Sequence, residues 1–345
     1  MSVHEKYMAK CLELATPGIR AAMPNPSVGA MIVRNHEIIG KGHTQPFGGN
    51  HAEVEAFKEI PRCENLSDAT LYVTLEPCAH YGNTPPCAEL IIQSGIKHVV
   101  IGSLDPNARV NGSGLNRLKS CGINVEVGPL KAECELLNKR FYTFHQKKRP
   151  YIVLKWAQTT DGFIDKIRKN NERGTQWITQ PETKKITHRW RSEEAAIVIG
   201  TNTAINDDPN LTVRAASGTN PVRIVLDKDG KLPKNLSLFD GASRTIILSS
   251  KKLASTKNYE VWNINFDNFI SEFNNALFAN GILSVIVEGG GQLLNSFLLA
   301  GVWDEARVLT GNKEFGAGLM APKISSPSTS IEKFNNDEIS YYFND

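Results

Sequence analysis

One histidine, one glutamate and two cysteines are the residues of this chain best suited to chemistry. His51 and Glu53 lie two positions apart in HAEVEAF, and Cys78 and Cys87 follow in LEPCAHYGNTPPC. A hydrolytic zinc site needs three protein ligands and one open position for water, because zinc lowers the pKa of that water toward neutrality. His51, Cys78 and Cys87 supply that number of ligands. Glu53 is then a candidate general acid and base beside the metal.

Other interpretations of these residues stay open at this point. A single buried cysteine is most often a small apolar residue, and a structural zinc site would need a fourth ligand, for which His80 is the nearest candidate. The combination favours catalysis, since histidine, any residue, glutamate and later proline-cysteine with a second cysteine is the pattern of zinc-dependent base deaminases. Eight residues separate Cys78 from Cys87 where two are usual. A longer loop can still return to the same metal.

The three candidate ligands are each expected at the start of a helix. His51 opens HAEVEAFKEI, Cys78 follows Pro77, and Cys87 follows a pair of prolines. The unpaired N–H groups and the positive end of the dipole at a helix start favour a thiolate. The local structure expected here therefore supports metal binding.

Length and composition limit the classes of protein that fit. A chain of 345 residues is long enough for two domains. The formal net charge of +3 comes from dispersed residues, which favours a small-molecule partner and argues against nucleic acid. No apolar run approaches the length of a membrane span, and the N-terminus carries charges where a signal peptide is apolar, so we expect a cytoplasmic protein. Six cysteines are too sparse and irregular for a disulfide scaffold.

Strands and helices alternate in the first part of the chain, which predicts a sheet with helices on both faces. The expected helices cover 4–16, 51–60 and 86–94, and the expected strands cover 28–33, 69–76, 98–105 and 123–128. A further helix begins at residue 131 and ends in a basic connector that terminates in proline. We therefore place a boundary near 145–150, with domains at 1–147 and 148–345.

The alternation starts again after this boundary and predicts a second α/β domain. The expected strands are 151–157, 195–200, 221–227, 244–250, 283–291 and 304–310, and the expected helices are 181–192, 267–279 and 291–299. Three glycines, Gly289 to Gly291, lie between a strand and a helix, where backbone N–H groups can approach a phosphate. They do not form a strict G-x-G-x-x-G pattern, so they do not by themselves indicate a dinucleotide site.

Nine motifs along nearly the whole chain resemble the bifunctional deaminase/reductase family of riboflavin biosynthesis. They are MPNPSVGAMIV, HAEVEAF, TLEPCAHYGNTPPC, DPNARVNGSGL, LKWAQTTDG, QWIT, TAINDDPNLTVR, VEGGGQLLNSFL and FGAGLMAP. The resemblance implies an N-terminal cytidine-deaminase-like three-layer α/β/α domain and a C-terminal dihydrofolate-reductase-like α/β domain. It implies zinc-dependent hydrolytic deamination of 2,5-diamino-6-(5-phosphoribosylamino)pyrimidin-4(3H)-one. NADPH-dependent reduction of the ribosyl chain would then give 5-amino-6-(5-phosphoribitylamino)uracil.

The resemblance also implies roles for residues of the first domain. His51, Cys78 and Cys87 match the ligands of one zinc ion per chain, and Glu53 matches the proton shuttle. The positions that line the pyrimidine pocket are Asn25, His43 and Asn107. On the residues alone, an asparagine in PNP is equally typical of a turn, and a histidine after glycine is more often an ordinary loop residue.

Two departures from the family pattern affect this domain. Asn83 stands where many relatives carry a basic residue suited to the substrate phosphate, so the phosphate anchor is not defined by the sequence. Ala108 stands where proline is common, next to Asn107.

For the second domain the resemblance implies one set of cofactor positions and one of substrate positions. The NADPH set is Ala157, Trp177, Thr203, Asp207, Gly289, Gly290, Gly291, Gln292, Leu293 and Leu294. The substrate set is Thr175, Arg191, Leu211, Arg214 and Glu288. A planar guanidinium suits a ribosyl phosphate because it donates two parallel bonds, although surface arginines mostly form weak solvated pairs. Trp177 is equally consistent with a core aromatic residue.

Two other functions deserve comparison with the bifunctional enzyme. In one alternative the second domain serves only in binding or regulation, but the intact DDPNLTVR and EGGGQ argue against this. A nucleic-acid editor of related zinc fold is a third possibility, against which the near-neutral charge and the lack of a basic aromatic stripe weigh. A homo-oligomer, either a dimer or a tetramer, is implied only by analogy with the family.

Overall fold

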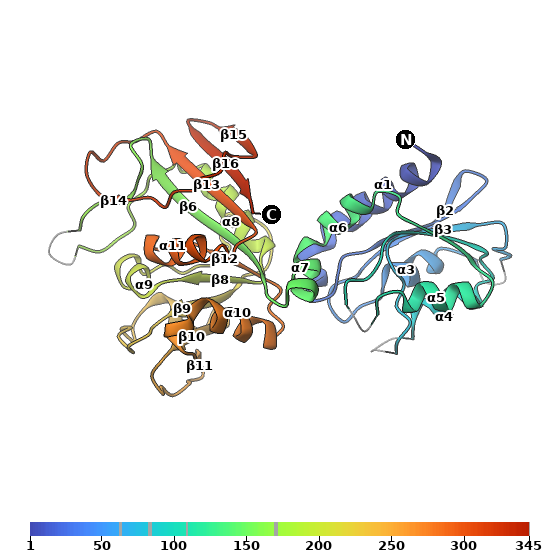
Figure 1. The fold of residues 1–345 in the computed structure, drawn as a ribbon, viewed down its shortest axis with the longest axis horizontal. Coiled ribbons are helices and arrows are strands. Elements are labelled where there is room, and N and C mark those ends of the chain that lie inside the picture. Colours follow the sequence, from blue (N-terminus) through green and yellow to red (C-terminus); the bar gives the residue numbers. More distant parts are fainter. Residues whose placement is uncertain (62–63, 82–84, 108–109, 169–171, 345) are drawn as a thin grey trace. The chain divides into compact units, whose positions relative to one another are not determined.

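The computed structural model describes residues 1–344 except 62–63, 82–84, 108–109 and 169–171. Asn83 and Ala108 lie outside the described residues. Contacts divide the chain into two compact units, Met1–Lys148 and Arg149–Asp345 (Figure 1). Among the helices described, none is both long and apolar enough to cross a membrane.

The first unit is built on a five-stranded sheet in the order β2-β1-β3-β4-β5. The strands are β1 (Gly29–Arg34), β2 (Glu37–His43), β3 (Thr70–Leu75), β4 (His98–Ser103) and β5 (Asn124–Val127). β3, β4 and β5 run parallel, whereas β1 is antiparallel to both β2 and β3. The carboxyl ends of β3 and β4 therefore leave the sheet at the same edge.

Helices cover both faces of this sheet, which gives three layers (Figure 1). They are α1 (Val3–Ala15), α2 (Ile19–Ala22), α3 (Ala52–Lys58), α4 (Cys87–Gln93), α5 (Ser113–Ser120), α6 (Lys131–Leu137) and α7 (Lys139–Lys147). α1 and α6 pack on one face, where Met8 and Cys134 join the same buried apolar group. α3 packs on β1 and β2 and also contacts α4. Two zinc-ligand candidates, His51 just before α3 and Cys87 at the start of α4, are thus carried by neighbouring helices.

The second unit is built on a nine-stranded sheet in the order β11-β10-β9-β8-β12-β6-β13-β16-β15. Its strands are β6 (Tyr151–Thr159), β8 (Ala196–Ile199), β9 (Val222–Leu226), β10 (Thr245–Ser249), β11 (Glu260–Asn263), β12 (Ser284–Val287), β13 (Glu305–Gly311), β15 (Ser330–Phe334) and β16 (Asp337–Phe343). The strands from β11 to β13 are parallel, and β16 and β15 complete the sheet as an antiparallel edge. β7 (Phe163–Asp165) pairs separately with β14 (Leu319–Met320).

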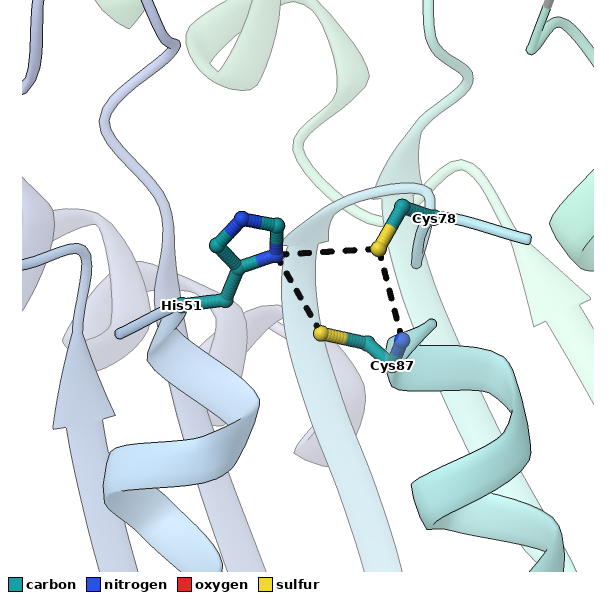
Figure 2. Close-up of side chains that lie close together, drawn as sticks. All are labelled: His51, Cys78 and Cys87. Carbon is teal, nitrogen blue, oxygen red and sulfur yellow. Dashed lines mark hydrogen bonds between the residues drawn. The ribbon is translucent and has the colours of Figure 1, made fainter. Parts of the chain in front are cut away.

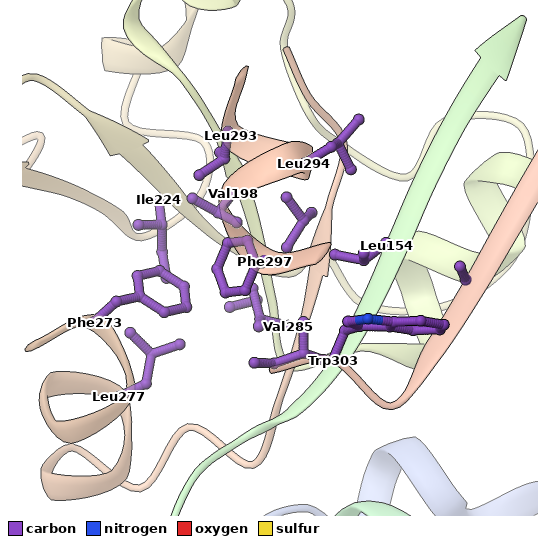
Figure 3. Packing of buried hydrophobic residues seen from close by; sticks show 14 of the residues in the cluster. Leu154, Val198, Ile224, Phe273, Leu277, Val285, Leu293, Leu294, Phe297 and Trp303 are labelled. Carbon is purple, nitrogen blue, oxygen red and sulfur yellow. The ribbon is translucent and has the colours of Figure 1, made fainter. Parts of the chain in front are cut away.

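Apolar residues on both faces of this sheet are buried by helices. The helices are α8 (Thr183–Glu193), α9 (Thr201–Asp207), α10 (Phe269–Ala279) and α11 (Gly291–Ala300). Phe273 of α10 and Phe297 of α11 meet edge to face, 5.5 Å apart, over one side (Figure 3). Trp190 of α8 belongs to the core on the other side. Strands buried on both faces explain the almost continuous apolar runs in the sequence.

The structure departs from the sequence pattern in two informative places. The helix expected from 131 onward is interrupted at Asn138, which separates α6 from α7. β2 was not predicted from the sequence, because Gly40 and Gly42 lie within it and glycine is unfavourable inside a strand. A Cβ on either glycine would overlap the backbone of α3, so both are needed for helix and strand to approach closely.

Candidate active sites

His51, Cys78 and Cys87 converge at one edge of the first sheet (Figure 2). His51 precedes the first residue of α3, Cys78 follows β3 by three positions, and Cys87 begins α4. His51 Nδ1 lies 3.6 Å from Cys78 Sγ and 3.3 Å from Cys87 Sγ. The three candidate ligand atoms all lie within 4.8 Å of one another. Side chains separated by up to 36 positions therefore face a common point.

The chemistry of this group fits zinc. One imidazole nitrogen and two sulfurs are donors that zinc prefers, and three protein ligands leave a fourth position open. Over the part of the chain that the structure describes, this metal-binding group has three members, and His80 is not one of them. The geometry therefore matches a catalytic site better than a closed structural one.

Hydrogen bonds favour the thiolate form of Cys78. The Cys87 thiol, the His51 ring and the backbone N–H of Cys87 together lower the pKa of Cys78 well below its usual value, although burial opposes them. The N–H of Cys87 donates to Cys78 Sγ over 3.3 Å. A thiolate is the form in which cysteine binds a metal.

Glu53 is the buried carboxyl group beside these ligands. It lies in the first turn of α3 and is 4% exposed. Burial raises the pKa of Glu53 to about 7, the charge of Cys78 adds to this rise, and the Cys87 side chain hydrogen-bonds to Glu53. A carboxyl group with a pKa near neutrality can both accept and return a proton.

Two segments that carry predicted pocket residues lie next to each other. Val28, three positions after Asn25, exchanges hydrogen bonds with Thr44, the neighbour of His43. Asn138 holds the same segment, because its side chain accepts from Ser27 N over 2.9 Å and donates to Ser27 O over 2.8 Å. Nothing in the sequence pattern connects Asn138 to this segment, which lies 111 positions away.

Asn107 lies on the segment that follows β4. Its backbone N–H donates to the Asp105 carboxylate over 2.8 Å. Leu75 of β3 pairs with Ser103 of β4, so Cys78 and Asn107 leave the sheet at the same edge, one after each strand. Binding sites in parallel sheets form at such carboxyl ends.

The glycines of the second unit form a close turn between β12 and α11. Gly290 precedes the first residue of α11, and the carbonyl of Gly289 accepts from Gly200 N over 2.9 Å. A Cβ on Gly290 would lie 3.2 Å from Thr203 Oγ1. The structure thus brings Thr203 of α9 to the glycine turn at the carboxyl ends of the adjacent strands β8 and β12. Gly200, which lies between β8 and α9, contacts this turn. The sequence reasoning missed it, although it follows an apolar strand directly.

Glu288 is the centre of a buried group of charges next to the glycine turn. Arg191 Nε and Nη2 each donate to one Glu288 oxygen over 2.7 Å, and Lys155 Nζ lies 3.7 Å from Oε2. Burial opposes ionisation of Glu288, but Arg191 and then Lys155 outweigh it and lower its pKa to about 2. Burial, Arg191 and Arg214 lower the pKa of His188 to about 4.

The predicted arginines Arg191 and Arg214 bond residues of this buried charged group. The two parallel donors of Arg191 are directed to Glu288, and Nη1 donates to Thr212 O over 3.4 Å. The backbone N–H of Arg214 donates to His188 Nδ1 over 3.0 Å. Lys155 and His188 were missed, because a lysine in an apolar strand and a histidine in a basic helix give no distinct pattern.

The remaining predicted cofactor and substrate positions differ in their exposure. Trp177 is 53% exposed, and the ammonium of Lys184 lies 3.6 Å from the centre of its ring, so it is no core aromatic. Asp207 pairs with Arg168, which sequence reasoning missed, over 2.6 Å. Gly174, the neighbour of Thr175, donates to Asn206 O. The segment with Thr175 therefore adjoins the end of α9.

Leu211, Leu293 and Leu294 are buried, and Ala157 is partly buried. Ala157 shares a face of β6 with Lys155, two positions before it. Leu211 is 2% exposed. Leu293 and Leu294 pack in the hydrophobic core (Figure 3), and Gln292 precedes them on the exposed side of α11. The backbone N–H of Leu294 donates to Gly290 O over 3.1 Å, so neither this group nor the buried side chain is available to a ligand.

Two family models match separate parts of the chain. The family model "RibD C-terminal domain" matches residues 150–337, and "Cytidine and deoxycytidylate deaminase zinc-binding region" matches residues 1–103. The riboflavin biosynthesis protein RibD of Aquifex aeolicus is 38% identical over 92% of this chain and 89% of its own length. The RibD protein of Bacillus amyloliquefaciens is 38% identical over 94% and 88%.

Two solved structures resemble the whole chain. A diaminohydroxyphosphoribosylaminopyrimidine deaminase/5-amino-6-(5-phosphoribosylamino)uracil reductase from Thermotoga maritima is 36% identical and superposes with a TM-score of 0.89, covering 99% of this chain and 98% of its own. RibD of Acinetobacter baumannii is 28% identical with a TM-score of 0.87 and the same coverage.

Proposed function

This chain belongs to the RibD family of riboflavin biosynthesis proteins, and from that premise we propose how its residues carry out two reactions. It is a bifunctional enzyme with a zinc-binding deaminase domain and an NADPH-dependent reductase domain. We assign deamination to residues 1–147 and reduction to residues 148–345. The observation that carries the first assignment is the convergence of His51, Cys78 and Cys87 beside Glu53.

The proposed substrate of the first domain is 2,5-diamino-6-(5-phosphoribosylamino)pyrimidin-4(3H)-one, which loses ammonia by hydrolysis. The second domain then reduces the ribosyl chain to give 5-amino-6-(5-phosphoribitylamino)uracil. The name of the Thermotoga maritima enzyme supports both substrates, since that structure covers 99% of this chain. A small molecule is accordingly the partner of each site.

In the first domain, His51, Cys78 and Cys87 would hold the zinc ion. Bound zinc supplies a water molecule of lowered pKa, and therefore a nucleophile near neutral pH. Glu53 accepts the two protons of the attacking water in turn and delivers one to the ring nitrogen and the other to the amino group, which leaves as ammonia. Its pKa of about 7 allows both transfers in the same pH range. Asn25, His43 and Asn107 orient the pyrimidine.

In the second domain, the turn at Gly289–Gly291 and Thr203 would hold phosphate groups of NADPH. Bound NADPH supplies the hydride. The turn fits a phosphate because a side chain at Gly290 would crowd Thr203, and because the backbone N–H groups of α11 begin there. Glu288, fixed by Arg191, faces the substrate as an acceptor for sugar hydroxyl groups. Positioning of this kind is the main requirement of hydride transfer.

A metal analysis combined with a two-step product assay tests the proposal. We expect one zinc ion per chain, ammonia release from the diaminopyrimidine, and NADPH oxidation that requires the deaminated product. A chain that releases ammonia but never oxidises NADPH with pre-deaminated substrate would favour a binding or regulatory role for the second domain. A cytoplasmic location and a homo-oligomeric state are proposed only by analogy with the family.

A further inference from the structure

We propose that Glu76 is a positioning residue of the deaminase, which holds the loop bearing Asn107 at the pyrimidine pocket. The proposal rests on the assignment of Asn107 to substrate binding made above. Glu76 is 4% exposed and lies between β3 and Cys78, so it is part of the segment that presents a proposed zinc ligand. Its carboxylate accepts hydrogen bonds from the segment that follows β4.

All the hydrogen bonds described for the Glu76 carboxylate come from the backbone that follows β4. Oε2 accepts from Asp105 N over 3.2 Å and from Gly112 N over 3.0 Å. Oε1 accepts from Gly114 N over 2.9 Å and from Leu115 N over 3.1 Å. A carboxylate only accepts, at about four sites, so these donors use its full capacity. Because the group is buried, each unmade bond would be costly.

These bonds belong to a closed network, or ring, of hydrogen bonds that runs from Glu76 through Asp105 and Asn107 and returns to Glu76 at Gly112. The Asp105 carboxylate accepts from Asn107 N over 2.8 Å, and Asn107 O accepts from Val110 N and Asn111 N over 2.8 and 2.9 Å. The next residue, Gly112, returns to the same carboxylate oxygen that holds Asp105 N. The main chain of Asn107 is therefore fixed on both sides, and the ring closes on Glu76.

Glu76 also supplies the capping group that α5 lacks. The residue that precedes α5 is Gly112, which has no side chain to accept from the first N–H groups of the helix. The donors Gly114 and Leu115 belong to that first turn. A Cβ on Gly114 would overlap the carbonyl of Pro77, so α5 begins directly against the residue that precedes Cys78. One carboxylate thus ties the loop and the helix to the segment that presents Cys78.

Glu76→Gln tests this role with little change of shape, because it replaces one acceptor oxygen by an NH₂ group that faces N–H donors. We expect the KM of deamination to rise about tenfold, with a smaller fall in kcat. Zinc content and the reductase kinetics of the same chain should be unchanged. Glu76→Asp, which keeps both acceptors, should recover part of the KM. Glu59→Gln is the matched control, since the Glu59 carboxylate accepts a backbone N–H, that of Lys41. The KM of deamination should not change in this variant.

Asn107→Ala, alone and combined with Glu76→Gln, shows whether the glutamate acts through Asn107. We expect Glu76→Gln to add little to the KM of Asn107→Ala, because the two changes damage the same interaction. Additive effects, or an unchanged KM in Glu76→Gln, would overturn the positioning role and leave the deaminase assignment intact. If Asn107→Ala alone leaves KM unchanged, the pocket assignment is wrong and the positioning role falls with it.

A second variant decides the question if Glu76→Gln loses zinc or fails to fold. Asp105→Ala removes the acceptor of Asn107 N–H at a half-buried position and leaves the Glu76 bonds in place. The proposal expects a raised KM with normal zinc content. An unchanged KM in Asp105→Ala would contradict it.

Discussion

The two proposed sites of this chain are built in different ways. The deaminase site depends on residue types that are rare and chemically distinct, each placed at the end of a strand or the start of a helix. The reductase site depends on glycines, which contribute space, and on a glutamate whose surroundings come from α8 and β6. The first kind of site can be recognised from residue types and spacing. The second becomes visible only when distant partners are brought together.

The largest effect expected concerns the residue on which the chemistry of the first site depends. Glu53→Ala should retain zinc, because Glu53 is not among the proposed ligands, but it should lower kcat of deamination by about 10²–10⁴-fold through loss of proton transfer. Reduction of pre-deaminated substrate should continue. The measurements are metal content, ammonia release and NADPH oxidation.

Glu55→Ala is the matched control for this variant, since Glu55 lies on the same helix and its carboxylate accepts from Asn50 and Lys58. Its deamination rate should stay close to that of the unaltered chain. Loss of zinc in Glu53→Ala would show that the carboxylate has been wrongly assigned.

The next largest effect tests the network of the second site. Arg191→Ala leaves the buried carboxylate of Glu288 without its bidentate partner, which costs about 3–5 kcal/mol when a buried pair is broken from one side. We expect a lower midpoint of unfolding for the second domain and weaker reduction, with little change in deamination. Thermal unfolding and steady-state NADPH oxidation measure the two effects.

Arg189→Ala provides the comparison, because Arg189 is exposed on the same helix and pairs with Glu193 over 3.6 Å. An exposed pair of this kind contributes about 0.2–1 kcal/mol. If both variants reduce substrate normally, Arg191 has no part in the reductase site.

The extent to which sequence anticipated the structure follows the same division. The two-domain α/β fold and most buried strands were predicted, because apolar runs bounded by turns are local signals. The edge strand β15 and its neighbour β16 were not; β15 is mostly exposed and carries no apolar pattern. Arg191, Arg214 and Glu288 were named through the family resemblance, but Lys155 and His188 were not. A buried ion pair between residues 97 positions apart leaves no local trace in a single sequence.

A smaller effect is expected from the glycine turn. Gly290→Ala would place a methyl group 3.2 Å from Thr203 Oγ1, so either the turn or α9 must shift by a few tenths of an ångström. We expect the KM for NADPH to rise about tenfold while deamination is unchanged. Leu299→Ala, at an 89% exposed position of the same helix, is the control. An unchanged KM for NADPH would remove the turn from the cofactor site.

The smallest effect concerns Asn138, which bonds Ser27 in the first domain from 111 positions away. Here the first site, like the second, depends on a partner distant in sequence. Asn138→Ala leaves the buried N–H and C=O of Ser27 without their partners, and a buried unsatisfied group costs about 1–3 kcal/mol. The first domain should therefore unfold earlier, and the segment that carries Asn25 should be held less firmly, which raises the KM of deamination severalfold. Asn258→Ala, which removes one bond to Phe239 O in the second unit, is the control.

Tryptophan fluorescence and zinc release report separately on the unfolding of the two domains. All five tryptophans belong to the second domain, so their fluorescence follows its unfolding, whereas zinc release follows the first domain. Asn138→Ala should shift zinc release to lower denaturant and leave the fluorescence transition in place, with the opposite result for Asn258→Ala. If zinc release does not move, the segment at Ser27 is fixed by its neighbours alone. Asn138 would then have no part in holding the deaminase pocket.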